Sequence, residues 1–220
     1  MKRILVLDIG GSSVKVSASG RKKGVSIPSG PDLTPQALVK AVRHATAGWK
    51  YDVVSIGFPG MVGRAGPAED APNLGNGWVG FDFEVAFGRP VKVVNDDAMQ
   101  ALGSYQGGRM LFLGLGTGLG SALILEGVLH PMELGDLPFR NGRAYADCLG
   151  KAVLRKVGVA KWSEQVRTAV GQLKGAMLAD YVVLGGGEAQ YVGKLAEGVL
   201  LGDNSKAILG GFRLWQKSAH

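Results

Sequence analysis

Two glycine-rich segments of the chain, residues 8–15 and 114–120, each follow a short apolar run. The first reads Asp-Ile-Gly-Gly-Ser-Ser-Val-Lys and the second reads Gly-Leu-Gly-Thr-Gly-Leu-Gly. Because glycine has no Cβ, its backbone can take positive φ and bring N–H groups against phosphate oxygens. No Gly-Lys-Ser/Thr follows and strand-like residues come next, which excludes a Walker loop and a dinucleotide fingerprint. The segments predict two phosphate-binding turns, and the structural alternative is a pair of ordinary hairpin turns.

Polar side chains that could act in proton transfer or bind a metal lie near the ends of the expected strands. Asp8 is a candidate magnesium-side carboxylate and Lys15 a candidate phosphate ligand, although each could simply face water. Asn95-Asp96-Asp97 follows an apolar run, at the carboxyl end of a strand where ligands bind in open α/β sheets. An aspartate at this place could accept the proton of an attacking hydroxyl, but on local evidence a helix N-cap is slightly favoured, and it is the expected role of Asp97.

A third acidic segment, Glu133-Leu134-Gly135-Asp136, comes after the second glycine-rich segment. Its two carboxylates are three residues apart and would suit adjacent hydroxyls of a sugar. Taken alone, the segment would be an ordinary acidic turn.

The charge balance favours anionic ligands. Lysine and arginine outnumber aspartate and glutamate by 25 to 18, which gives a formal net charge of +7. The basic residues are dispersed apart from Arg21-Lys22-Lys23, so a solvated surface is the plainer explanation. Nucleic acid is not an expected partner.

Cysteine and histidine usage excludes several classes of protein. A single cysteine, Cys148, allows no internal disulfide, and three scattered histidines give no zinc-ligand spacing. The apolar run Ile4–Leu7 ends at Asp8, far short of a secretory segment, and no other run approaches a membrane span. We therefore expect a cytoplasmic protein without a membrane segment.

The elements that must hold these residues alternate between strands and helices. Apolar runs predict strands at 4–7, 14–18, 53–56, 91–94, 110–113, 121–125 and 181–184. Helical patterns predict helices at 34–43, 98–102, 144–157 and 163–179, and a terminal helix at 204–217 that is broken near Gly210-Gly211. This alternation is typical of an α/β protein.

The opening pattern of strand, glycine turn and strand occurs twice. Setting Leu7 against Leu113, 106 residues further on, aligns the two hairpins without gaps. An internal duplication is the natural inference, and it predicts two similar lobes with a cleft between them.

Taken in order, the motifs resemble those of the ROK-type sugar kinases over nearly the whole chain. They are residues 8–15, 57–60, 73–74 with Trp78, 95–96, 114–120, 133–135 and 185–187. Within that family the chain looks closest to the polyphosphate glucokinase branch, on residues 116–123 and the lack of the family's cysteine-rich zinc motif.

The resemblance implies an actin-like sugar kinase fold, with two ribonuclease-H-like lobes around a cleft. The N-terminal lobe would comprise residues 1–105 together with the C-terminal helix 204–220, and the C-terminal lobe residues 106–203.

The resemblance also implies roles for named residues. Asp96 would be the base for the sugar 6-hydroxyl, and Asp8 would hold Mg²⁺, directly or through water. Sugar ligands would be Asn73, Asn95, Glu133 and Asp136. Phosphate or cofactor neighbours would be Asp8, Gly10, Gly11, Ser12, Lys15, Gly116, Thr117, Gly118, Gly186 and Gly187.

The implied activity is transfer of a terminal phosphoryl group from polyphosphate or ATP to the 6-hydroxyl of a hexose, with glucose as the first candidate. The family motif continues Glu-x-Gly-His where this chain has Asp136, which leaves the identity of the sugar open. The alternatives are a sugar-binding regulatory relative and a catalytically impaired one. The expected partners are a sugar and a phosphoryl donor, and a homodimer is the assembly considered.

Overall fold

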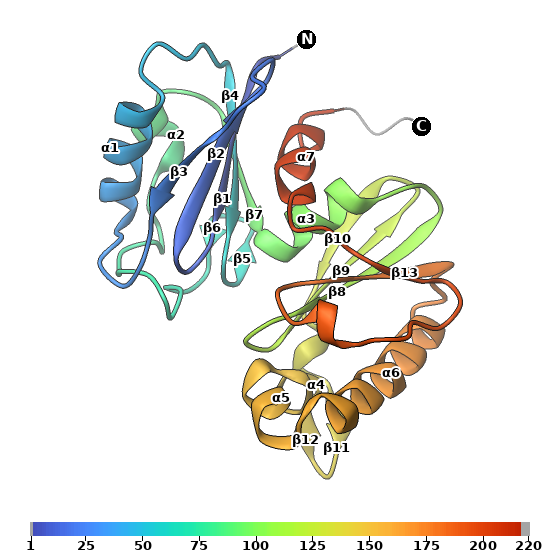
Figure 1. Ribbon diagram of the computed structural model, residues 1–220. Helices are drawn as coiled ribbons and strands as arrows, with labels where there is room; N and C mark the ends of the chain where they lie inside the picture. Colours follow the sequence, from blue (N-terminus) through green and yellow to red (C-terminus); the bar gives the residue numbers. More distant parts are fainter. Residues whose placement is uncertain (1, 217–220) are drawn as a thin grey trace. The chain divides into compact units, whose positions relative to one another are not determined.

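A computed structural model describes residues 2–216, which form two compact units (Figure 1). The described part of the first unit is residues 2–99 and 207–216, and the second unit is Gln100–Lys206. Each unit has its own five-stranded mixed sheet. The structure confirms the predicted mixed α/β class.

The sheet of the first unit has the strand order β3-β2-β1-β4-β7. β1 is the central strand of this sheet, antiparallel to β2 and parallel to β4. Its apolar run is fully buried because the sheet is covered at this position. The strands are β1 (Ile4–Ile9), β2 (Ser13–Ala18), β3 (Val25–Pro28), β4 (Val53–Phe58) and β7 (Val91–Asn95), with a small hairpin of β5 (Val62–Gly63) and β6 (Gly66–Pro67).

Two helices contribute to the core of this unit. α1 (Pro35–Ala45) begins at Thr34, whose hydroxyl accepts a hydrogen bond from the Ala37 amide at 3.3 Å. Its buried residues include Leu38 and Val42. α2 (Phe83–Phe87) is short and ends at Gly88 in the left-handed conformation.

The terminal helix, α7 (Lys206–Arg213), runs unbroken through Gly210-Gly211, so the predicted break is wrong. Both glycines are buried. A Cβ at Gly211 would lie 2.3 Å from Cγ1 of Val6, so glycine is needed here for close packing on β1. The Ser55 hydroxyl donates a hydrogen bond to the Gly211 carbonyl at 2.6 Å, which fixes the helix to β4.

The sheet of the second unit has the order β10-β9-β8-β13-β14. Its strands are β8 (Arg109–Leu115), β9 (Leu119–Leu125), β10 (Val128–Met132), β13 (Tyr181–Gly185) and β14 (Val199–Leu201). β8 is central, antiparallel to β9 and parallel to β13. The remaining elements of the second unit are α3 (Asp96–Ser104, shared with the first unit), η1 (Leu134–Asp136), the hairpin β11 (Pro138–Arg140) and β12 (Arg143–Ala144), α4 (Tyr145–Leu149), α5 (Lys151–Val157), α6 (Val159–Ala176) and η2 (Ala189–Tyr191).

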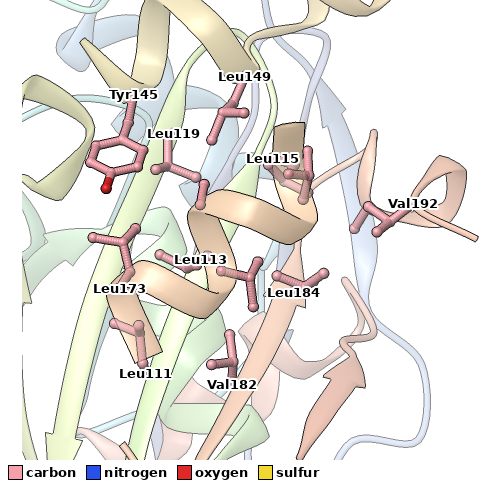
Figure 2. Packing of buried hydrophobic residues seen from close by; sticks show 14 of the residues in the cluster. Leu111, Leu113, Leu115, Leu119, Tyr145, Leu149, Leu173, Val182, Leu184 and Val192 are labelled. Atoms are coloured by element: carbon pink, nitrogen blue, oxygen red, sulfur yellow. The ribbon is translucent and has the colours of Figure 1, made fainter. Parts of the chain in front are cut away.

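The core of the second unit lies between its sheet and α6. Leu113 from β8, Leu184 from β13 and Leu173 from α6 belong to one buried cluster, and Figure 2 shows their side chains together. Trp162, also on α6, is fully buried, and its indole N–H donates to the Leu149 carbonyl at 2.9 Å.

The two hairpins differ by one residue, so the gapless alignment is wrong. In the first hairpin Ile9 pairs with Val14, whereas in the second Leu115 pairs with Leu119. The turn between these pairs therefore comprises residues 10–13 in the first unit and residues 116–118 in the second.

Several predicted boundaries also need correction. The predicted helix 144–157 is two helices, because Gly150 is extended and separates α4 from α5. α6 begins at Val159 rather than at Ser163. The outer strands β3, β10 and β14 and the short helix α2 were not predicted, because few of their residues are buried and the periodic signal is weak.

Within residues 2–216, none of the helices combines the length and the apolar character that crossing a bilayer requires.

Candidate functional site

Asp8 and Lys15 face each other across β1 and β2. They are a register pair, and the Lys15 ammonium lies 3.6 Å from Oδ2 of Asp8. The Asp8 side chain is 15% exposed and that of Lys15 is 53% exposed. Burial raises the pKa of Asp8, and the positive charge of Lys15 opposes this effect only in part. Asp8 is thus a weakly solvated carboxylate with one cation beside it.

Asp96 is the first residue of α3 and follows β7 directly. On the neighbouring strand β4, Gly57 pairs with both Asp8 and Val94. A Cβ at Gly57 would lie 2.5 Å from Cε of Met99 and 3.4 Å from Cα of Asp96, so glycine lets the first turn of α3 approach the sheet. Asp8 and Asp96 thereby lie at the carboxyl ends of β1 and β7, the two strands that flank β4.

The pKa of Asp96 is raised well above its ordinary value. The largest cause is burial, and the negative charges of Asp97 and Asp8 add to it. The Asp97 amide donates a hydrogen bond to Oδ1 of Asp96 at 3.0 Å, which opposes the shift. A carboxylate with a raised pKa is a better proton acceptor, which is the property a general base needs.

Asn95 is the residue that caps α3. Its Oδ1 accepts a hydrogen bond from the Ala98 amide at 3.2 Å, and its Nδ2 donates to the Gly60 carbonyl at 3.1 Å. The capping role considered for the aspartates therefore belongs to Asn95. These two bonds also fix the orientation of the Asn95 amide at the point where Asp96 begins.

The first glycine turn is held by hydrogen bonds within the unit. The Gly10 amide donates to the Ser13 carbonyl at 2.9 Å, and the Ser29 amide donates to the Ser12 carbonyl at 3.2 Å. Gly11 and Ser12 are exposed. A Cβ at Gly11 would lie 3.3 Å from Cβ of Asn73, so this predicted sugar ligand lies beside the turn.

The second glycine turn, residues 116–118, is exposed at Thr117. The Gly116 amide donates to the Gly118 carbonyl at 3.3 Å, which closes the turn. A Cβ at Gly150 would lie 2.3 Å from the Thr117 carbonyl oxygen, so the junction between α4 and α5 packs against the turn.

The third glycine segment, Gly185–Gly187, lies beside the same strand end. Gly186 has φ of 82°, and a Cβ there would lie 2.1 Å from the Leu115 carbonyl oxygen. The second unit therefore brings the turn at residues 116–118 near Gly186.

Glu133 and Asp136 are exposed residues at the two ends of the segment that includes η1. The Ser121 hydroxyl fixes this segment, because it donates to the Met132 carbonyl at 2.8 Å and accepts from the Leu134 amide at 3.0 Å. The Asp136 amide donates to the Glu133 carbonyl at 3.3 Å.

Three residues that contribute to these arrangements were not predicted: Ser121, Lys151 and Glu188. Lys151 and Glu188 form an ion pair of 3.5 Å next to the second and third glycine segments. Lys151 was hidden because the interval 144–157 was interpreted as one helix. The signal that could have found it is the Gly150-Lys151 pair itself, since glycine interrupts a helix.

A magnesium site would have to be built mostly by the substrate. Among residues 2–216, no three Asp, Glu, His or Cys side chains gather into a group that could hold a metal ion. Mg²⁺ often binds through one or two carboxylates together with phosphate oxygens and water. Asp8 fits that pattern as a single weakly solvated carboxylate beside a glycine turn.

No family model matches the chain, but individual proteins do. Polyphosphate glucokinase of Mycobacterium tuberculosis is 25% identical over 210 residues, which cover 86% of this chain and 78% of that protein.

Solved structures share the fold over almost the full length. An inorganic polyphosphate/ATP-glucomannokinase from Arthrobacter sp. strain KM has a TM-score of 0.78 at 22% identity and covers 96% of this chain and 97% of its own. A ROK family glucokinase from Streptomyces griseus, solved in complex with glucose and AMPPNP, has a TM-score of 0.70 at 17% identity and covers 96% and 98%. Together with the ordered motifs and the two matching sheets, these similarities show that the chain has the fold of the ROK sugar kinases and resembles polyphosphate glucokinases in sequence.

Proposed function

We propose that the protein transfers the terminal phosphoryl group of inorganic polyphosphate or ATP to the 6-hydroxyl of a hexose, with glucose as the first candidate. The observation that carries the proposal is Asp96, a carboxylate whose pKa is raised by burial and by the charges of Asp97 and Asp8. Such a group at the carboxyl end of a strand is suited to accept a proton from a bound hydroxyl.

In the proposed reaction the sugar O6 attacks the terminal phosphorus of the donor. The new O6–P bond forms as the bond to the bridging oxygen of the donor breaks, and the O6 proton passes to the Asp96 carboxylate. The leaving group is ADP or a polyphosphate shortened by one unit. Because such transition states are loose, we assign Asp96 mainly the tasks of orienting the hydroxyl and taking its proton late.

Further roles follow from the same proposal. Asn73, Asn95, Glu133 and Asp136 would hydrogen-bond sugar hydroxyls. The turn at residues 116–118 and the segment Gly186-Gly187 would bind the donor through backbone N–H groups. Asp8 would hold Mg²⁺, which supplies charge neutralisation on the phosphates.

Two properties of relatives support the choice of substrates. The Mycobacterium tuberculosis relative is a polyphosphate glucokinase, and the Arthrobacter structure is a polyphosphate/ATP-glucomannokinase. The formal charge of +7 is compatible with an anionic polymer as donor.

The test is a phosphorylation assay with the purified protein and each donor supplied separately. Glucose and mannose are offered with ATP in one series and with polyphosphate in the other, and the hexose 6-phosphate is quantified. We expect product from at least one pairing, dependent on Mg²⁺. The absence of product from every pairing, with a protein that melts cooperatively, would overturn the proposal.

A further inference from the structure

The ion pair between Lys151 and Glu188 lies in the second unit, outside the roles assigned so far. The two groups are 3.5 Å apart, from Nζ of Lys151 to Oε1 of Glu188. The Glu188 side chain is only 11% exposed, whereas that of Lys151 is 49% exposed. A buried carboxylate is costly unless a charge neutralises it, so Lys151 is held at this place by a fixed anion.

The backbones of the two residues are attached to adjacent positions at the end of β8. The Lys151 amide donates to the Gly116 carbonyl at 2.8 Å, and the Glu188 amide donates to the Leu115 carbonyl at 3.2 Å. The Lys151 backbone is therefore bonded to the second glycine turn. Its ammonium lies beside Glu188, the residue that follows Gly185–Gly187. Its side chain connects the two glycine segments.

Glycines make both attachments possible. A Cβ at Gly150, the residue before Lys151, would lie 2.3 Å from the Thr117 carbonyl oxygen. A Cβ at Gly186 would lie 2.1 Å from the Leu115 carbonyl oxygen. The position of the ion pair is thus set by close backbone packing on both sides, and not by the ion pair alone.

We propose that Lys151 binds a phosphate of the phosphoryl donor and that Glu188 is its positioning residue. The inference rests on the proposed phosphotransfer, which it deepens by adding a cationic donor ligand to the two glycine segments. An ammonium has three N–H donors, so it can keep its bond to Glu188 and still offer N–H groups to phosphate oxygens. Its half-exposed side chain is accessible to such a ligand.

The ion pair with Lys151 also explains why the Glu188 carboxylate is tolerated next to the proposed phosphate site. An unpaired Glu188 would repel the donor, and the Lys151 ammonium cancels that charge. An ion pair whose lysine is half exposed contributes little to stability, so stability gives a weak reason for this pair. A role toward the donor gives a stronger one.

The experiment compares Lys151→Ala and Lys151→Arg with a matched control, Lys156→Ala, which removes the same charge from an exposed position on the same helix. For each variant, KM is measured for the donor and for the sugar. The affinity for inorganic tripolyphosphate is measured by titration calorimetry without sugar.

We expect Lys151→Ala to raise the donor KM and the tripolyphosphate Kd roughly 10- to 100-fold, as for loss of a hydrogen bond to a charged group. The sugar KM should stay within a few-fold. Lys151→Arg should recover most of the loss because it keeps the charge, and Lys156→Ala should match the unchanged protein.

The role of Glu188 is tested with Glu188→Gln and with the double variant. If Glu188 acts through Lys151, the Gln change alters the donor KM in the presence of Lys151 and has no further effect once Lys151 is alanine. Equal effects in both backgrounds would show that Glu188 acts independently of Lys151 and would overturn its positioning role.

A merely structural ion pair predicts a different result. Lys151→Ala would then lower the melting temperature and leave the donor KM and the tripolyphosphate Kd unchanged, which overturns the inference while phosphotransfer stands. Tripolyphosphate binding that depends on Lys151, in a protein without phosphotransfer, would reject the proposed function and keep only the phosphate-binding role of Lys151. Absence of any binding of tripolyphosphate would reject the inference.

Discussion

The two sheets of the molecule have the same strand order and directions but different chemistry at the same place. In the first sheet, Asp8 on β1 pairs with Lys15 on β2. At the corresponding place in the second sheet, Gly114 on β8 pairs with Gly120 on β9. A charged pair in one unit is replaced by two residues without side chains in the other.

The next strand of each sheet extends the comparison. Gly57 lies beside Asp8, and Gly185 lies beside Gly114, so both units have glycine at this position. At Gly57 the space is used by the first turn of α3, which carries Asp96, whereas at Gly185 it is used by Phe112 and Gln100. The same arrangement of strands thus positions carboxylates in the first unit and bare backbone at the corresponding place in the second, as the tasks proposed above for Asp96 and for the second glycine turn would need.

The largest expected effect comes from removing the Asp96 carboxylate, which follows the last strand of the first sheet. Asp96→Asn should lower turnover roughly a hundredfold or more, because the amide cannot accept the O6 proton. The sugar KM should stay within a few-fold, since Oδ1 can still accept the Asp97 amide. Steady-state kinetics with saturating donor measure both quantities, and undiminished turnover would refute the assignment.

Two adjacent glycines of the second unit should differ in how much an alanine substitution lowers stability. Gly186→Ala should lower the free energy of unfolding by roughly 2 kcal/mol, because φ is 82° and the Cβ would lie 2.1 Å from a backbone oxygen. Gly187→Ala is the matched control, since no atom lies within 4 Å of its Cβ. Urea unfolding of the two variants gives the comparison, and equal stabilities would contradict it.

The raised pKa of Asp96 predicts that the same substitution stabilises the fold. Folding raises the pKa of the Asp96 carboxyl, so its ionised form destabilises the folded state. This cost is present above the unfolded pKa of about 4 and is absent below it. Asp96→Asn should therefore melt at a higher temperature than the unchanged protein at pH 7, and the gain should vanish as the pH falls below about 4. Exposed Asp32 provides the control: Asp32→Asn should show no such gain.

The smallest expected effect tests the charged pair itself. Lys15 lowers the pKa of Asp8, so Lys15→Met should raise it further and move the acid limb of the pH–rate profile to higher pH. The shift should be modest because the lysine side chain is about half exposed. Lys23→Met, which removes an exposed charge outside the pair, should leave the limb in place. A limb that moves to lower pH would contradict the assignment of Asp8.

The central strands β1 and β8 were predictable from sequence because their apolar runs are buried. Ile4–Leu7 and Leu111–Leu113 are continuous apolar runs, and the glycines after them mark the turns. The one-residue difference between the turns was not predictable, since both turns are rich in glycine and small polar residues. The register is visible only in the strand pairing, where Ile9 lies opposite Val14 and Leu115 opposite Leu119.

The candidate site was likewise predictable from sequence only in part. The role of Asp96 was predicted from the family resemblance rather than from its place after a strand, and its raised pKa depends on burial and on Asp8, which is distant in sequence. Glu188 as the partner of Lys151 depends on a tertiary contact, whereas Asn95 caps α3 through a local bond from the Ala98 amide. At Gly211, glycine predicted a break in a helix, whereas the structure uses the missing side chain for packing on Val6.

That packing of α7 on β1 also bears on the order in which the molecule folds during its synthesis. The ribosome releases residues 100–206 before α7, so the second unit is contiguous and can fold as soon as it emerges. The face of the first sheet around Val6 and Ser55 must wait for α7, because the bond from Ser55 to Gly211 spans 156 residues. Contacts of such long sequence separation form late. The unit that is synthesised first is therefore the unit that is completed last.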